Sequence, residues 1–346
     1  SNIDAEQALI GSILVNNDII DEVSSIINPS IFFDPGHVKI YEVIENLKYS
    51  KFNKNISVYG QSVEKPLFVK HFIGIKKLMG KKKQLLDAID PVWERIQIEA
   101  KAAVQKEPLL GGSLHACILH HSTIEEALAY RIASKLASQE MSEQILREIC
   151  DDAYKNEKEL SLAGRADIVA VYQRDPACNT YLQPLLFFKG FQALQAYRVA
   201  HWLWNRDRKD MAYFLQMRCS EVFGIDIHPG ARIGKGIMID HAHSIVIGET
   251  AVVGDNVSML HSVTLGGTGK EDEIRHPNIG DGVLLGAGAK VLGNISVGSC
   301  SRVAAGSVVL QNVPEKSTVA GVPAKVVGAA GCTNPSISMD QIIKRK

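Results

Sequence analysis

Aliphatic residues recur at every sixth position late in the chain, and this spacing is the most informative pattern in the sequence. The series slips by two positions once, is interrupted once, and otherwise keeps its period: Ile227, Ile233, Ile239, Ile245, Ile247, Val253, Met259, Ile279, Leu285, Val291, Val297, Val303 and Val309. A hexad is too short for helices and too long for one alternating strand. It suits a parallel β-helix whose triangular coils take one hexapeptide per face. The interruption, residues 266–278, is polar and Gly-rich, which predicts a loop expelled from one face.

The residues before this repeat follow a helical period instead. Between residues 124 and 153 the apolar positions are three or four apart, as in amphipathic helices: Ala127, Leu128, Ile132, Leu136 and Ala137. Residues 1–90 are mostly helix-like and become Lys-rich at 76–83. The pattern predicts an α+β chain with a helical extension at 1–90, a helical domain at 91–222, a β-helix at 223–328 and a tail at 329–346.

Composition excludes several classes of protein. The 346 residues carry 38 Lys and Arg against 38 Asp and Glu, so no basic excess points to nucleic acid and no acidic excess points to disorder. No apolar run of about 18 residues occurs, and the first residues do not resemble a secretory signal. Six cysteines are scattered without a CxxC pair: Cys117, Cys150, Cys178, Cys219, Cys300 and Cys332. Reduced thiols are expected, and with them a cytoplasmic location, or alternatively a plastid.

Several motifs appear in a fixed order along the chain. The helical part contains DPVWERIQIEA at 90–100, QRDPAC at 173–178 and LLFFKGFQALQAYRVAHWLW at 185–204. The repeat contains DIHPGARIGKGIMIDHAHSIVIGE at 226–249, SVTLGGTGK at 262–270, RHP at 275–277, LGAGAK at 285–290 and AGVPAKVVG at 320–328. Over about residues 90–330 the chain resembles the serine acetyltransferases. The resemblance implies a left-handed β-helix, an exception to the usual right-handed crossover. It also implies acetyl transfer from acetyl-CoA to L-serine, the first step of cysteine biosynthesis.

The resemblance assigns the catalytic base to His241 and its orienting carboxylate to Asp226. A serine hydroxyl is a poor nucleophile and needs a base of near-neutral pKa, which is the natural role of histidine. An aspartate would hold the imidazole's tautomer and stabilise the imidazolium, as in a catalytic triad. The two residues are 15 positions apart in a coil of about 18, so the spacing permits contact between neighbouring coils without proving it.

The same resemblance supplies the binding residues. For L-serine it implies Asp175 and Asp240 at the ammonium and Arg275 at the carboxylate with His276 nearby, matching the need of each charge for its opposite. For acetyl-CoA the candidates are a backbone donor to the oxyanion at Gly267, next to Gly266, and small or basic residues along the cofactor: Ala287, Ala305, Lys290 and Lys325.

Three other chemistries were weighed against direct transfer. The GGTGK segment lacks the Gly and the Ser or Thr of a phosphate-binding loop. Among the histidines of the repeat, at 228, 241, 243, 261 and 276, no HxxxxH pair supports zinc, so no metal is expected. Cys178 and Cys219 have no evident histidine partner for a covalent route. A hexapeptide acyltransferase acting on another hydroxyl, such as a sugar or homoserine, and a non-catalytic scaffold remain the alternative functions.

Both ends of the chain depart from this family. Residues 3–47 resemble the start of the N-terminal domain of DnaB-type helicases, but no Walker motif follows, so helicase activity is not implied. The Lys-rich stretch is expected to be a solvated face, with no nucleic acid and no membrane as partner. The family implies a homotrimer or a dimer of trimers, with L-cysteine as competitive feedback inhibitor. Its tail often ends in Ile and docks into O-acetylserine sulfhydrylase, but here Ile343 precedes three basic residues, which puts that docking in doubt.

Overall fold

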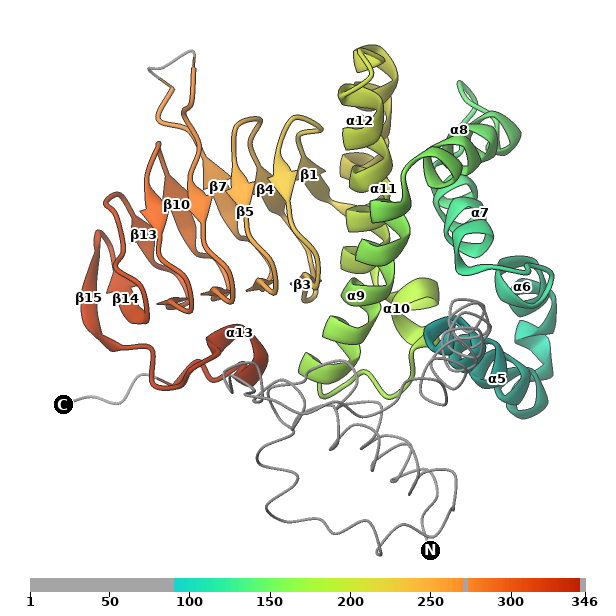
Figure 1. Cartoon of the computed structure of the whole chain (residues 1–346), viewed down its shortest axis with the longest axis horizontal. Coiled ribbons are helices and arrows are strands. Elements are labelled where there is room, and N and C mark those ends of the chain that lie inside the picture. The colour runs from blue at the N-terminus through green and yellow to red at the C-terminus, as the bar shows by residue number, and fades with distance from the viewer. Residues whose placement is uncertain (1–89, 270–272, 343–346) are drawn as a thin grey trace, which may run out of the picture. The chain divides into compact units, whose positions relative to one another are not determined.

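The structure is a computed structural model that describes residues 90–269 and 273–342, all within one compact unit. Its helical part precedes its strands (Figure 1). The helices are α5 (Pro91–Lys106), α6 (Gly111–Leu114), α7 (Ile124–Leu136), α8 (Glu143–Asn156), α9 (Lys158–Arg174), α10 (Leu182–Phe187), α11 (Lys189–Trp204), α12 (Lys209–Phe223) and, near the end of the chain, α13 (Pro335–Ser338). A 3-10 turn, Pro108–Leu110, and a π turn, His115–Leu119, flank α6.

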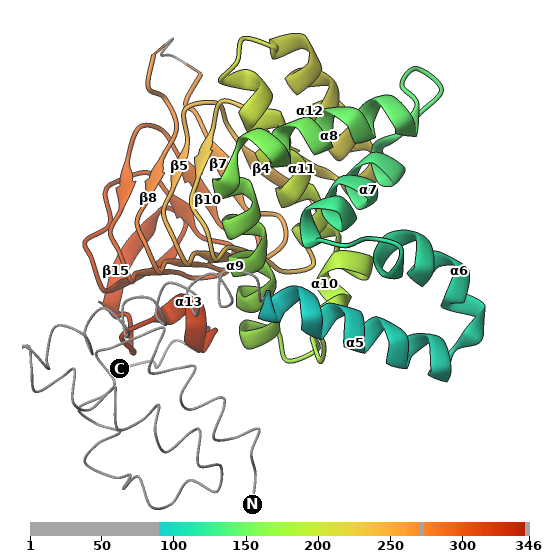
Figure 2. The ribbon, with the colours of Figure 1, turned by 45° about the vertical axis from the view of Figure 1, so that its right-hand side comes forward.

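Local side-chain chemistry explains where these helices begin. The side chains of Asp90, Thr123 and Ser142 accept hydrogen bonds from backbone N–H groups three residues later, which caps α5, α7 and α8. Helix α11 is buried on almost every side, from Gly190 to Leu203. It lies with α9 and α12 between the first strands and the outer helices α7 and α8 (Figures 1 and 2). The helical part therefore has α11 as its central element.

The strands form the three faces of a prism. They are β1 (Ile225–Ile227), β2 (Arg232–Ile233), β3 (Met238–Ile239), β4 (Ile245–Ile247), β5 (Val252–Val253), β6 (Ser258–Met259), β7 (Thr264–Gly266), β8 (Asn278–Ile279), β9 (Leu284–Leu285), β10 (Lys290–Leu292), β11 (Ser296–Val297), β12 (Arg302–Val303), β13 (Val308–Val309), β14 (Ser317–Gly321) and β15 (Ala324–Ala329). Their orders are β1-β4-β7-β10-β13, β11-β8-β5-β2 and β15-β14-β12-β9-β6-β3. All the pairs are parallel except β14 with β15, which closes the last coil.

The aliphatic hexad positions stack in register inside this prism. On one face Ile239 pairs with Met259, Met259 with Leu285, and Leu285 with Val303, and all four side chains are buried. The parallel β-helix predicted from the period is confirmed. The described residues of the interruption between β7 and β8, 267–269 and 273–277, lie outside the strands, and the coils on either side remain paired.

The slip of two positions in the hexad has a structural cause. Strand β4 points both Ile245 and Ile247 inward and Val246 outward, whereas the register aligns Ile247 with Leu265. From Ile239 to Ile247 the chain takes eight positions, against six from Met259 to Leu265 in the next coil. The first coil therefore has a corner that is two residues longer than the equivalent corner above it.

A buried ion pair joins the helical part to the first coil. Asp167 of α9 is 0% exposed and accepts hydrogen bonds from Arg198 and Gln195 of α11 and from the backbone N–H of Ile237. Arg198 also donates to the carbonyl oxygen of Gly234 at 2.8 Å. Helix α12 runs into β1 through Gly224, whose φ of +68° suits glycine at a helix C-terminus. These contacts set the position of α9 and α11 against the first coil.

Some predictions fall outside the described residues. These are the helical extension at 1–90, apart from Asp90 itself, the Lys-rich stretch at 76–83, and the last residues of the tail, 343–346, which include Ile343. In the part of the chain that is described, no helix has the length and apolar character needed to cross a membrane.

Candidate active site

His241 lies on the long corner between β3 and β4. The backbone has positive φ at His241, Ala242 and Ser244, of 53°, 57° and 57°, a region that non-glycine residues rarely occupy. The N–H of Ser244 donates to the carbonyl of Gly224, and Ala242 is fully buried, which holds the corner in place. The imidazole of His241 is 75% exposed. Its ring therefore points out of the prism, as a catalytic base requires.

Helix α11 approaches this corner at its first turn. A Cβ at Gly190 would lie 2.2 Å from the carbonyl oxygen of Ile239, so only glycine permits the contact. The adjacent Lys189 places its Nζ 3.1 Å from Nδ1 of His243. The corner is thus held by the helical part as well as by the coil.

Two carboxylates share a cleft with His241. This cleft, which we call the base cleft, has a volume of 630 Å³. It is lined by Val171, Asp175, Pro176, Ala177, Phe187, Phe188, Lys189, Gly190, Phe191, Met238, Ile239, Asp240 and His241. Oδ2 of Asp240 is 3.8 Å from Nε2 of His241. Burial raises the pKa of the Asp240 carboxyl, and the charge of Asp175 raises it further, whereas His241 and His261 oppose the rise. The structure therefore brings Asp175, Asp240 and His241 together.

Small residues continue from His241 along one edge of the prism. The paired inward residues on this face are Ile239, Met259, Leu285 and Val303. Two positions after each of them comes a residue of this edge: His241, His261, Ala287 and Ala305. Successive coils are joined at this edge, where Gly288 donates to His261 and Gly306 to Ala287. The rings of His241 and His261 are 5.9 Å apart and edge to face. Lys290 and Lys325 are exposed on β10 and β15.

Asp226 lies away from this group. It is on β1, where its Oδ1 accepts a hydrogen bond of 2.6 Å from Gln216 of α12. It lines a separate recess with Tyr213 and Ser220. Among the described residues no hydrogen bond or ion pair joins Asp226 to His241, so within one chain the carboxylate nearest the ring is that of Asp240.

Arg275 and His276 form a second group with the residues that follow β4. We call this group the loop cluster; it comprises Glu249, Thr250, Gly267, Arg275 and His276. Arg275 pairs with Glu249 at 2.5 Å, and Nδ1 of His276 is 2.9 Å from Oγ1 of Thr250. A Cβ on Gly267 would be 3.5 Å from Nε2 of His276. Burial lowers the pKa of His276, and the charge of Arg275 lowers it further.

The base cleft and the loop cluster do not meet within the described chain. None of the residues that line the base cleft belongs to the loop cluster, and His276 instead lines a recess with Trp204 and Asn278. The sequence had assigned all these residues to one site. The arrangement accommodates that assignment only if the loop cluster of one copy faces the base cleft of another.

Sequence reasoning overlooked several residues of these groups. Glu249 and Thr250 hold Arg275 and His276, but no role was assigned to them from the sequence; Glu249 ends the quoted 226–249 motif and Thr250 follows it. Gly248, directly after the hexad residue Ile247, also had no role, yet a Cβ there would lie 2.0 Å from Nε2 of His276. Lys189 belongs to the quoted FKGFQ segment and lines the base cleft. Each was visible in or next to a motif, but its partner is distant in sequence.

Neither cysteine weighed for a covalent route is suited to it. Burial raises the pKa of Cys178 to about 11 and that of Cys219 to about 12, so neither thiol ionises near neutral pH. Within residues 90–269 and 273–342, no three His, Cys, Asp or Glu side chains gather as a metal site would need.

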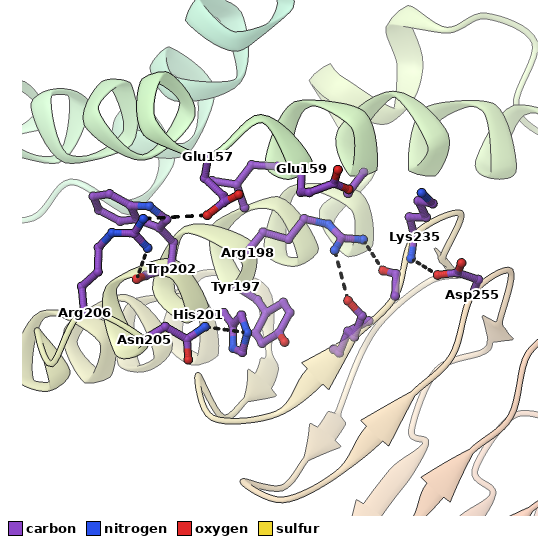
Figure 3. Close-up of a pocket in the computed structure, with 14 residues that line it drawn as sticks. Glu157, Glu159, Tyr197, Arg198, His201, Trp202, Asn205, Arg206, Lys235 and Asp255 are labelled. Carbon is purple, nitrogen blue, oxygen red and sulfur yellow. Dashed lines mark hydrogen bonds and ion pairs between the residues drawn. The ribbon is translucent and has the colours of Figure 1, made fainter.

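A further cavity lies where the helical part meets the first coil (Figure 3). It measures 420 Å³, and none of the predicted site residues lines it. Two of its arginines are engaged by neighbouring groups: Arg206 is 3.8 Å from Glu157, and Arg198 donates to the carbonyl of Gly234 (Figure 3). We regard this cavity as part of the junction between the two regions.

Comparison with known families identifies three segments of the chain. The family model described as "Serine acetyltransferase, N-terminal" matches residues 92–196, and "Bacterial transferase hexapeptide (six repeats)" matches residues 276–311. "DnaB-like helicase N terminal domain" matches residues 1–66. A serine acetyltransferase of Salmonella typhimurium is 52% identical over 255 residues, which is 74% of this chain and 93% of the relative.

Solved structures are similar over the same region. A serine acetyltransferase of Brucella abortus in complex with coenzyme A is 54% identical with a TM-score of 0.70, covering 72% of this chain and 99% of that one. A serine acetyltransferase of Neisseria gonorrhoeae in complex with serine is 51% identical with a TM-score of 0.67, covering 68% and 98%. Another, in complex with cysteine, is 48% identical with a TM-score of 0.72, covering 73% and 98%.

Proposed function

The chain belongs to the serine acetyltransferase family, an acyltransferase that uses acetyl-CoA, and on that premise we propose that His241 is the general base of direct acetyl transfer to L-serine. The exposed ring at the long corner supports this proposal, because it can reach a bound hydroxyl and is next to two carboxylates. The single observation that carries it is the grouping of Asp175, Asp240 and His241 in one cleft.

The proposed reaction moves one proton and one acetyl group. The imidazole of His241 takes the hydroxyl proton as the serine oxygen attacks the thioester carbonyl. The tetrahedral oxyanion then collapses, the carbon–sulfur bond breaks, and the imidazolium returns the proton to the departing thiolate of coenzyme A. The base ends neutral, so each cycle is balanced without a covalent enzyme intermediate.

Substrate binding divides between the two groups. Asp175 and Asp240 would hold the ammonium of L-serine, while Arg275 and His276 would hold its carboxylate. Because these pairs do not share a cavity in one chain, we propose that the carboxylate side comes from a second copy in a homotrimer or a dimer of trimers. Gly267 of that copy, next to His276, would then supply the backbone N–H for the oxyanion.

Acetyl-CoA is proposed to lie along the edge that leads away from His241. Ala287 and Ala305 stand below the base on successive coils, and their small side chains leave room for the pantetheine arm. Lys290 and Lys325 are exposed and could meet the phosphates of coenzyme A. Asp226 is still proposed as the carboxylate that orients the His241 imidazole; within one chain its Oδ1 accepts a hydrogen bond from Gln216.

The remaining assignments follow the family. L-cysteine, which differs from serine in one atom, is proposed as a competitive inhibitor in the base cleft; one similar structure was solved with cysteine. Docking of the tail to O-acetylserine sulfhydrylase and a cytoplasmic or plastid location stay predictions. The segment that matches the helicase domain is assigned no catalytic part.

Replacing His241 by Ala tests the proposed base. We expect turnover of serine to fall by about a hundredfold to ten-thousandfold, because that is the usual contribution of a general base. The measurement is the release of coenzyme A thiol from acetyl-CoA with L-serine, homoserine and sugars as alternative acceptors. Cysteine binding by calorimetry should persist in the variant, since the carboxylates remain.

His115→Ala provides the matched control, because His115 is an exposed histidine of the helical part. We expect it to keep the activity of the unmodified chain. If His241→Ala retained turnover within about threefold of the control, His241 would not be the base. A preference for another acceptor would overturn the substrate assignment.

A further inference from the structure

Arg174 is a buried cation whose hydrogen-bond partners are all uncharged. It is the last residue of α9 and is 5% exposed. Nη1 donates to the carbonyl of Gly236 at 3.0 Å and to Oγ of Ser258 at 3.1 Å, and Nη2 donates to Oδ1 of Asn256 at 3.2 Å. Burial lowers the pKa of Arg174 to about 10, against which the charge of Asp167 acts. The side chain thus remains charged near neutral pH.

Burying the Arg174 guanidinium in this way lowers the stability of the fold, so stability by itself does not explain it. A buried charge is normally paired with an opposite charge, and among the described residues no carboxylate lies within ion-pair distance of Arg174. Its Nε has no hydrogen-bond partner. The fork of the guanidinium nevertheless reaches two coils at once, since Gly236 belongs to the first coil and Asn256 and Ser258 to the second.

The residue that follows is one of the proposed serine-binding carboxylates. Asp175 caps α9, and its N–H donates to the carbonyl of Val171 at 2.9 Å. Its Oδ1 accepts from the N–H of Ala177 at 2.8 Å, which turns the chain into the wall of the base cleft. Any movement of the end of α9 would therefore move Asp175 relative to Asp240, which is carried by the coil.

The C-terminal segment covers the same contact. Oγ of Ser258 accepts from Arg174 and donates to the carbonyl of Ser336 in α13 at 2.8 Å. The N–H of Ser336 donates to the carbonyl of Gly282. Helix α13 lies beside the end of α9 in both views (Figures 1 and 2). Arg174 is consequently enclosed by the helical part, the coil and the tail.

From this geometry we propose that Arg174 is a positioning residue for amino-acid binding. It clamps the end of α9 to the first two coils and so sets the separation of Asp175 from Asp240 across the base cleft. It touches neither substrate. The inference rests on the proposed function, because it takes Asp175 as a ligand of the serine ammonium.

The test compares Arg174→Met with Arg174→Lys and with Arg208→Met, an exposed arginine on the other side of the helical part. For Arg174→Met we expect the KM for L-serine and the inhibition constant of L-cysteine to rise by about tenfold or more, because a small misplacement of a binding group is costly. The KM for acetyl-CoA should stay within about twofold. Lys, which keeps the charge but not the fork, should recover part of the loss, and Arg208→Met should change nothing.

A second variant separates loss of the Arg174 contact from misfolding of Arg174→Met. Ser258→Ala removes one acceptor of Arg174 with little change of volume, and we expect a rise of about threefold in the KM for serine with the circular dichroism spectrum of the folded protein retained. In an Asp175→Asn background, Arg174→Met should add little further, because both changes act through one carboxylate.

Three outcomes would overturn the proposal. The first is an unchanged KM for serine in folded Arg174→Met and Ser258→Ala. The second is an equal rise in the KM values for serine and acetyl-CoA. The third is full additivity with Asp175→Asn. All three leave the loss of turnover in His241→Ala intact, so failure of this proposal is distinguishable from failure of the proposed function.

Discussion

At the scale of single residues, the corner that carries His241 combines strain with exposure. Left-handed backbone costs an L-residue roughly 1–2 kcal/mol, and here three of four successive residues adopt it. The cost is met by buried contacts of Ala242 and by the approach of Gly190. Strain of this kind is retained where a side chain must be held out of the regular coil.

Asp240 makes binding of the amino acid depend on pH. Its carboxyl must be ionised to hold an ammonium, and burial raises its pKa, with Asp175 adding to the rise. The protonated fraction therefore grows as pH falls through that raised value. We expect the dissociation constant of L-cysteine, measured by calorimetry, to increase over the same range.

Asp240→Asn should abolish the weakening of L-cysteine binding at low pH that comes from protonation of Asp240. This variant should bind cysteine weakly at every pH. His241→Asn, with the carboxylate intact, should keep that weakening. If cysteine bound to Asp240→Asn with the unmodified pH profile, the titration would belong to another group.

At the scale of elements, a buried ion pair between α9 and α11 also hydrogen-bonds the first coil. Asp167 accepts from two residues of α11 and from Ile237 of the coil, so removal of Arg198 leaves a buried carboxylate without its cation. The position of α9, and with it of Asp175, depends on this pair. The slip of two positions in the hexad also determines the site, because it makes the corner between β3 and β4 longer and His241 lies on that corner.

Arg198→Met is expected to lower the free energy of unfolding by about 3–5 kcal/mol, the usual effect of breaking a buried ion pair from one side. The matched control is Arg147→Met, whose partner Asp151 is on the surface of α8 and whose loss should cost about 0.5 kcal/mol or less. Both values come from urea unfolding monitored by circular dichroism. Equal effects of the two substitutions would contradict the role given to the Asp167 pair.

At the scale of the whole molecule, the separation of the base cleft from the loop cluster underlies the proposal that two copies share one site. A chain with His241→Ala still carries an intact loop cluster, and a chain with Arg275→Ala still carries an intact base cleft. In an assembly of both, some clefts would face an intact partner. The proposed shared site therefore predicts complementation between two inactive variants.

The measurement is thiol release from a mixture made by co-expression of the two variants with different affinity tags. Random assembly of a ring should restore about a quarter of the unmodified activity per chain, because one cleft in four then has both parts intact. Mixing the purified variants without exchange of subunits is the control. Absence of recovery in verified mixed assemblies would place the whole site within one chain.

Much of this molecule could be predicted from local pattern. The hexad period determined the β-helix because an aliphatic side chain at every sixth position has one way to stack, and Ile239, Met259, Leu285 and Val303 do so. The DHA, RDPA and RHP motifs named the chemistry, since each carries the residue types that serine and a thioester require. Charge balance and scattered cysteines excluded other classes of protein.

Only the tertiary structure decided which of these residues meet. The family resemblance paired Asp226 with His241, and the structure shows that Asp226 on β1 accepts a hydrogen bond from Gln216 on α12. The sequence did not separate Asp175 and Asp240 from Arg275 and His276, which do not share a cavity within the described chain. It also had no signal for Arg174, whose acceptors are 62 to 84 positions away. A period fixes contacts within a coil, but contacts between a helix end and a corner depend on how the two regions pack.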